Sequence, residues 1–420
     1  MNAKWIPLSA AIALALGSAA ASAATTDFHG YLRGGVGSST NEGGTKSGSE
    51  FNKTKLGRLG NEFDTYGEVE LGQEVFNKDG KSFYVDSMLA MDSAGTGNNE
   101  NTKDNTANFG LKQLNVQAKG LIAAAPEAVL WAGKRFYQRH DLHIIDTKYW
   151  NVSGYGAGVE KIKAGQGDLS TAWIRDDANG LNINYADVRY AGLSPWAGSW
   201  IELGVDYAMP NKSDAQDNPD YVNPSGDFVN YQHGTDKGVM LTAELSQQMF
   251  GFWPKTVFQY ATKGLAQNMV SQGGGWYDAW SDNEEAKGFR IINTAEAPIT
   301  DNLQLAYVLT YGKTTNIDGF GQDQSLVSAV VRPIYQWDDY NKTMLELGYF
   351  RLNKDASWNP ADEGGKKATI SQAWSAGRGL LARPEIRVYT TYIKNDKGET
   401  FNNSTSDHDV RFGVQAEAWW

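Results

Sequence analysis

Three aromatic residues are candidates for binding chemistry, because two of them have a charged residue two positions away. Arg33 follows Tyr31 and Glu68 follows Tyr66, so each pair shares one face of an extended strand. The third, Trp419, lies in the last alternating segment of the chain. An aromatic ring can cover the C–H face of a pyranose, while carboxylates and guanidinium groups match its hydroxyls. The pattern indicates a surface for sugars, and the alternative is that each ring only fills space in a solvated, charged wall.

The elements that must position these residues are strands, and the last strand has the clearest pattern. One of its faces is apolar and carries Val410, Phe412, Val414, Ala416, Ala418 and Trp420. The other face carries Asp409, Arg411, Gly413, Gln415, Glu417 and Trp419. An apolar face that ends in an aromatic residue is typical of a strand that meets lipid, with its polar face toward an aqueous lumen. A soluble β-sandwich also has alternating strands, so this pattern alone leaves that alternative open.

The first part of the chain repeats the alternation. Phe28, Leu32 and Val36 share a face that is opposite to Tyr31 and Arg33. Further on, one face is predicted to carry Leu59, Phe63, Val69 and Leu71, and the other Arg58, Glu62, Asp64, Tyr66, Glu68 and Glu70. Strands in hydrocarbon must satisfy their backbone hydrogen bonds internally, so they must close into a cylinder. The length of the chain suits a barrel of about 16 to 18 strands.

The N-terminal residues predict export. Lys4 precedes the mostly apolar run Ile6–Leu16, and Ala19–Ala24 consists of small residues, as at a signal-peptide cleavage site. We therefore expect residues 1–24 to be a signal peptide and residues 25–420 to be a single barrel domain in the outer membrane of a Gram-negative cell. The net charge of −11 argues against nucleic acid as a partner. The chain has no cysteine, which excludes disulfides and thiolate metal sites.

Other chemistry is weakly supported. His140 and His143 with Asp141 and Asp146 do not have the spacing of a metal site, and we expect neither a metal nor a cofactor. Pairs of carboxylates arise freely on the polar face of alternating strands, so they do not indicate a glycosidase. The chain lacks a nucleophile elbow and a P-loop, and Gly273–Gly275 is predicted to be a loop. We expect no enzyme, although a secreted sugar-active protein is the alternative from another class.

Several motifs along the whole mature chain are specific enough to compare with a known family. The most specific is WAGKRFYQRHD at 131–141, followed by Asp146, Tyr149 and Trp150. Weaker individual motifs are DFHGY at 27–31, RLGNE at 58–62, LGQEV at 71–75, ELGVDY at 202–207, QYAT at 259–262, Arg383-Pro384 and Trp419-Trp420. Together these motifs resemble the maltoporin family.

This resemblance implies an all-β, antiparallel transmembrane barrel of 18 strands, a homotrimer, and passive diffusion of maltose and maltodextrins. It implies a constriction loop folded into the lumen at about Tyr137–Gly154. In that family a row of aromatic residues, the aromatic slide, guides the sugar, and its positions match Tyr31, Tyr66, Phe252 and Trp419. Phe252 depends on the resemblance alone. A polar track beside the slide matches Arg33, Arg58, Glu68, Lys112, Arg139, Asp141 and Asp146.

The chain also departs from the family pattern. Leu381 stands where a slide tryptophan is expected, and the segment 95–108, expected to lend a tryptophan to a neighbouring subunit, contains none. Lys112 stands where the polar track has an arginine, and lysine keeps the positive charge but lacks the planar guanidinium group. Lys148 replaces the constriction tyrosine. A porin for another sugar and a general diffusion porin therefore stay open as alternatives.

Lys148 leads to a separate hypothesis about the ion selectivity of the pore. A cation at the narrowest point raises the relative permeability to anions, as charged rings do in selective channels. The alternative is that Lys148 pairs with Asp141 or Asp146 and adds no net field.

Overall fold

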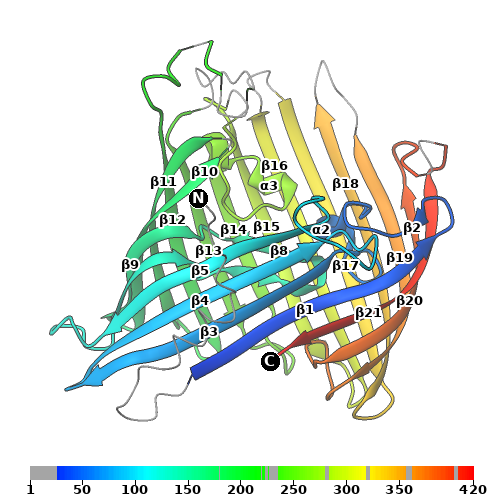
Figure 1. The fold of residues 1–420 in the computed structure, drawn as a ribbon, viewed down its shortest axis with the longest axis horizontal. Helices are drawn as coiled ribbons and strands as arrows, with labels where there is room; N and C mark the ends of the chain where they lie inside the picture. The colour runs from blue at the N-terminus through cyan, green and yellow to red at the C-terminus, as the bar shows by residue number, and fades with distance from the viewer. Residues whose placement is uncertain are drawn as a thin grey trace, which may run out of the picture.

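The computed structural model describes residues 26–178, 180–218, 220–222, 226, 235–279, 283–317, 322–355, 362–401 and 405–420. The predicted signal peptide, residues 1–24, lies outside the described residues. The chain forms a β-barrel whose strands tilt steeply around the axis (Figure 1). No helix in the described part of the chain is long and apolar enough to cross a membrane.

Eighteen strands form the closed wall, each antiparallel to its neighbours, and the last strand pairs with the first. The sheet has a nineteenth member, β2 (Gly43–Gly44), which pairs only with the end of β1. The wall strands are β1 (Thr26–Ser39), β3 (Thr65–Lys78), β4 (Lys81–Ser93), β5 (Ala107–Lys119), β6 (Val129–Arg135), β9 (Gly154–Ala164), β10 (Gly167–Ala178), β11 (Leu181–Leu193), β12 (Ser199–Asn211), β13 (Gly238–Gln247), β14 (Lys255–Thr262), β15 (Lys287–Pro298), β16 (Leu303–Ile317), β17 (Gln322–Gln336), β18 (Asn341–Asp355), β19 (Glu363–Ser375), β20 (Glu385–Asn395) and β21 (His408–Trp419).

The predicted alternation of the first and last strands is confirmed. On the outer face, Val36 is 73% exposed and Phe412 is 52% exposed. On the inner face, Asp409, Arg411 and Glu417 are buried. The barrel thus presents apolar side chains to the lipid and encloses its charged residues, as a transmembrane barrel requires.

The prediction of a strand from Arg58 onward is wrong for its first part. β3 begins only at Thr65, and residues 40–64 form a loop that contains α2 (Lys53–Leu56). Leu59 and Phe63, predicted to face lipid, are buried inside the barrel. Side chains of the wall supply hydrogen-bond donors to the backbone of this loop. Lys367 Nζ and Thr369 Oγ1 donate hydrogen bonds of 2.6 and 3.1 Å to the Leu59 carbonyl.

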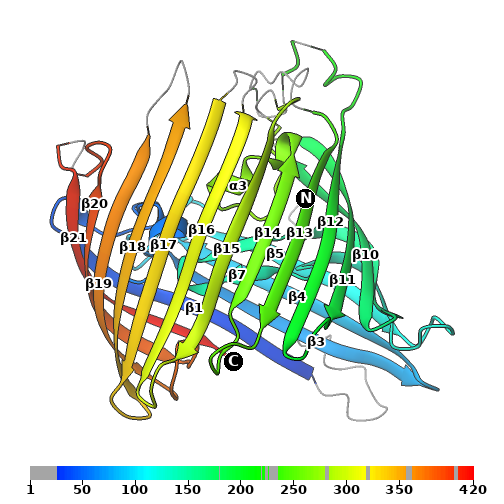
Figure 2. The same cartoon turned by 180° about the vertical axis from the view of Figure 1, so that it is seen from behind.

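Three loops enter the lumen rather than the single loop that was predicted. The prediction for Tyr137–Gly154 is confirmed: residues 136–153 hold β7 (His140–Leu142), the 3₁₀ helix η1 (His143–Ile145) and β8 (Thr147–Trp150). The others are residues 40–64 and the segment after β14, whose described residues 263–279 and 283–286 include η2 (Lys263–Leu265) and α3 (Asn268–Ser271). Helix α3 lies within the outline of the strands in two opposite views and contacts β14, β15, β16 and β17 (Figures 1 and 2). Helix α2 contacts β17, β18 and β19. All three loops start from the end of the barrel that carries the long loops, which is the external end.

Trp150 anchors the constriction loop, residues 136–153, to the wall. Its indole Nε1 donates a hydrogen bond of 2.9 Å to Asp206 of β12, and the Arg189 guanidinium lies 3.9 Å from the ring centroid. A side chain at Gly204 would overlap the indole ring, so this wall position needs a glycine.

His140 makes a second anchor. Its Nδ1 lies 3.0 Å from Glu244 of β13 and its Nε2 lies 3.5 Å from Glu202 of β12. Tyr149 and Lys255 also contact Glu244. Burial alone would lower the pKa of His140, but its hydrogen bonds to Glu202 and Glu244 outweigh this effect and raise the pKa above its ordinary value.

The first prediction concerns Gly204. In Gly204→Val, the new side chain should displace Trp150 and loosen the constriction loop, which gives noisier single-channel current and a lower thermal unfolding midpoint. Overpacking of this kind costs about 1–3 kcal/mol. Gly110→Ala is the control, since the nearest atom to its new Cβ would be 3.8 Å away. Equal current noise in the two variants would contradict the role of Gly204.

The second prediction concerns pH. Because the pKa of His140 is raised in the fold, its contribution to the free energy of unfolding is fully present below about pH 6.5, the ordinary value. That contribution is lost as the pH rises through the folded pKa. The unfolding midpoint of wild type should therefore exceed that of His140→Gln at pH 5.5, and the difference should shrink toward pH 9. His408→Gln, which changes an exposed pair with Asp407, is the control. A difference that is constant with pH would refute this account.

Candidate functional site

The junction of the first and last strands brings three of the predicted slide residues together. Tyr31 of β1 pairs with Trp419 of β21, and Arg33 pairs with Tyr66 of β3. The ring centroids of Tyr31 and Trp419 are 6.4 Å apart at an interplanar angle of 14°. Those of Tyr31 and Tyr66 are 6.1 Å apart. The three rings form a continuous row, in which Tyr66 is nearest the external end and Trp419 is nearest the chain terminus.

Charged groups surround this row. The Arg33 guanidinium carbon lies 5.9 Å from the Tyr31 ring centroid and 5.1 Å from that of Tyr66. The Tyr31 hydroxyl donates a hydrogen bond of 2.8 Å to Glu417 and accepts one of 3.1 Å from Arg58. The rings are therefore held by polar contacts at their edges, while both donors and acceptors lie beside them.

The narrow part of the lumen is built where two inward loops meet. Asp146 of the constriction loop accepts hydrogen bonds from Lys53 at 2.7 Å and from Lys148 at 2.9 Å. Lys53 also contacts Glu62 at 2.9 Å. Burial opposes the charge of Asp146, but Lys148, Arg58 and Lys53 outweigh it and hold the pKa of this carboxyl well below its usual range.

Lys148 pairs with Asp146, one of the two partners that were considered. Asp146 is shared, however, because Lys53 binds the same carboxylate and Arg33 lies 3.8 Å away. Lys53 and Arg33 in turn contact Glu62, so these cations and carboxylates form one network. Lys53 was missed by the sequence analysis, because it lies on α2, in a stretch where no inward loop was predicted.

The other predicted track residues lie near Tyr66. The Tyr66 hydroxyl donates a hydrogen bond to Glu68, and Lys112 Nζ lies 6.0 Å from the Tyr66 ring centroid. Arg139 is exposed, with its guanidinium 3.5 Å from the centroid of Phe136, and Asp141 is also exposed. These groups are accessible to a solute in the lumen.

Arg383 and His143 fix the orientation of Trp419. The Arg383 guanidinium lies 4.5 Å from the Trp419 ring centroid and donates a hydrogen bond of 2.6 Å to Glu417. His143 meets the indole edge-on, at 5.8 Å and 89°. Burial, together with Arg58 and Arg383, holds the pKa of His143 well below its usual range. Since Arg383 covers one face of the indole, the other face is the one available for stacking.

The structure does not bring Phe252 to the row of rings. Phe252 lies in the turn between β13 and β14, where it forms a bridge with Met249. It lines a depression of about 310 Å³ together with Leu245 and Tyr307, which lie on the outward faces of their strands. A hydrogen bond from Gln247 N to the Pro254 carbonyl continues the pairing of β13 and β14 beyond Lys255. When the inward and outward alternation of β14 is continued in the same direction, the lumen-side position falls to Trp253 rather than Phe252.

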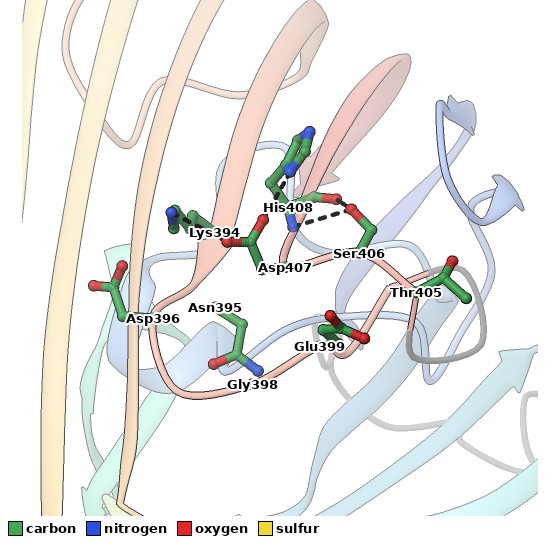
Figure 3. A pocket seen from close by; sticks show the side chains of 9 residues that line it. All are labelled: Lys394, Asn395, Asp396, Gly398, Glu399, Thr405, Ser406, Asp407 and His408. Atoms are coloured by element: carbon green, nitrogen blue, oxygen red, sulfur yellow. Dashed lines mark hydrogen bonds and ion pairs between the residues drawn. The ribbon is translucent and has the colours of Figure 1, made fainter.

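Leu381 lies in the turn between β19 and β20 and is 47% exposed, so this position carries no aromatic surface. A separate depression of about 470 Å³ lies on the loop between β20 and β21 (Figure 3). Three of its charged groups pair with one another, since Asp407 contacts Lys394 at 3.1 Å and His408 at 2.9 Å. This loop depression does not contribute to the row of rings.

Comparisons with known proteins agree with the geometry. The family described as LamB porin matches residues 26–420. Maltoporin 1 of Aeromonas salmonicida (strain A449) is 50% identical over 435 residues, covering 98% of each chain. Maltoporin 1 of Klebsiella pneumoniae subsp. pneumoniae is 49% identical over 438 residues and covers 100% of each chain. Maltoporin 2 of Yersinia pestis is 49% identical over 427 residues, covering 98% of each chain.

Solved structures show the same fold at low sequence identity. OccAB2 of Acinetobacter baumannii matches with a TM-score of 0.50 and 10% identity, covering 94% of this chain and 98% of that one. A variant of OccD1 (OprD) matches with a TM-score of 0.50 and 9% identity, covering 94% and 95%. With the closed barrel and the full-length relatives, the chain belongs to the LamB porin family and is a sugar-specific porin of the outer membrane.

Proposed function

We propose that this porin conducts maltose and maltodextrins, and that Tyr66, Tyr31 and Trp419 are its aromatic slide. The observation that carries the proposal is the unbroken row of three rings across the junction of β3, β1 and β21. The full-length relatives are named maltoporins, which supports the choice of sugar.

The row of rings supports a mechanism of successive weak contacts. A pyranose stacks its C–H face on one ring after another, since each ring presents a similar apolar surface. Its hydroxyls exchange hydrogen bonds among accessible groups beside the rings, such as Arg33, Glu68 and Arg139. Arg58 and Glu417 are buried and hold the Tyr31 hydroxyl in place. Each contact must be weak enough to release the sugar onward. No covalent bond changes, so we propose transport down a gradient without catalysis.

The polar track divides into two parts in this proposal. Glu68, Lys112, Arg139 and Asp141 meet the sugar near Tyr66 and the external side. Arg33, Arg58, Asp146 and Lys148 set the narrowest passage, because two inward loops join there. We also propose that the porin is a homotrimer and that residues 1–24 are the signal peptide, as the resemblance and the sequence imply.

The third prediction tests the slide. In planar bilayers maltotriose should block the ion current, and Tyr66→Ala or Trp419→Ala should weaken the binding that underlies this block. An aromatic contact contributes about 0.5–1.5 kcal/mol, which corresponds to about a twofold to tenfold loss of affinity. Sucrose and a neutral non-sugar solute are measured in parallel to show which sugar is preferred. Unchanged block in both variants would separate the rings from transport.

A matched pair of variants follows from the position of Phe252. Phe252→Ala should leave maltotriose block unchanged, because Phe252 lies with outward-facing residues. Trp253→Ala should weaken the block if the slide continues on the lumen side of this turn. The reverse result would restore Phe252 to the slide.

The fourth prediction concerns Lys148. Asp146 is shared by Lys53 and Lys148, so the loss of one lysine should still leave the carboxylate paired. Lys148→Tyr should therefore shift the reversal potential in a salt gradient toward cation preference, while Lys148→Arg should keep the wild-type value. Identical reversal potentials in wild type and Lys148→Tyr would show that the pair with Asp146 carries no net field.

A further inference from the structure

A small cavity lies on the external side of the constriction, apart from the row of rings. Its volume is about 100 Å³, and it is lined by Asn151, Ser153, Asp176, Tyr185, Gly274 and Trp276. Asp176 belongs to β10, close to the external end of that strand, and Tyr185 belongs to the neighbouring strand β11. A sugar entering from outside would therefore reach this cavity before the slide.

Trp276 is held in place at the edge of this cavity and is 42% exposed. A side chain at Gly273 would overlap the indole Nε1, so the glycine makes room for the ring. Asn268 Nδ2 donates a hydrogen bond of 2.7 Å to the Trp276 carbonyl, and Asn151 N donates one of 2.7 Å to the Gly274 carbonyl. The inward loop 263–286 is thus tied to the constriction loop, and Trp276 has a defined position.

The cavity offers polar groups that suit hydroxyls. Asp176 is an exposed residue on the inner face of β10 and lines the cavity. The Tyr185 side chain is 2% exposed and closes the cavity on the side of the wall. A carboxylate disfavours an anionic ligand, whereas a neutral polyol can donate hydrogen bonds to Asp176.

We propose that Trp276, Asp176 and Tyr185 form an entry subsite for a pyranose ring, which passes the sugar on to the slide. The sugar ring lies on the indole, and a hydroxyl-bearing edge or its ordered water enters the cavity, whose volume is enough for a few water molecules. This inference rests on the proposed sugar transport. It also assigns a function to the exposed Trp276, in a chain whose segment 95–108 contains no tryptophan.

The fifth prediction uses single channels inserted in one orientation, with maltotriose added to one side at a time. Trp276→Ala should lower the association rate from the external side by about threefold to tenfold, and leave the association rate from the periplasmic side unchanged. Asp176→Asn should lower the external rate by a smaller factor. Trp196→Ala, which removes an exposed tryptophan in the turn between β11 and β12, is the control and should change neither rate.

The outcomes separate this proposal from the function it rests on. If wild type shows no block by maltotriose from either side, the proposed transport of maltodextrins fails. If wild type is blocked and Tyr66→Ala weakens the block, but Trp276→Ala and Asp176→Asn keep the external association rate, the entry subsite is refuted. Open-channel conductance equal to wild type shows that each variant has kept the barrel and its constriction.

Discussion

In the hydrocarbon of a membrane, a backbone amide or carbonyl has no water to bind, so every strand must find its hydrogen-bond partners within the protein. This constraint explains why the wall has no free edge and why β1 pairs with β21. It also separates the two faces of each strand. Apolar side chains such as Val36 meet lipid, and charged side chains such as Arg411 are enclosed. The binding chemistry of the lumen follows from this separation.

Charges enclosed in this way must satisfy one another, and here they also hold the inward loops. Lys367 contacts Glu346 and donates hydrogen bonds to the loop carbonyls of Gly57 and Leu59. Arg290 donates to the Tyr149 carbonyl in the constriction loop. Breaking such a buried pair is expensive, because the remaining charge is left uncompensated. The shape of the passage is therefore set by ion pairs between wall and loops as well as by the strands.

The sequence predicted those parts of the fold that depend on a period of two residues. The faces of β1 and β21 and the position of Trp419 were predicted correctly from this period, whereas the inward loop at Tyr137–Gly154 was implied by the family resemblance. The alternation misled where it continued by chance into a loop, as at Leu59 and Phe63, because burial in the lumen selects apolar residues as lipid does. The inward course of residues 40–64 and 263–286 depends on contacts with distant strands, such as that of Leu59 with Thr369, which no local pattern encodes. Phe252 was assigned to the aromatic slide by resemblance alone, and it lies in a turn. A shift of one residue in the match to the family moves a side chain from one face of the strand to the other.

The row of rings crosses the junction where the barrel closes, with Tyr31 on the first strand and Trp419 on the last. These residues are separated by nearly the whole chain, so the row is complete only when the first and last strands have paired. During biogenesis an unfinished barrel would have most of its wall and yet no continuous path for a ligand. The hydrogen bonds between β1 and β21 close the barrel and also bring Tyr31 beside Trp419. A single pairing of strands therefore serves both the permeability barrier of the membrane and the uptake of sugar.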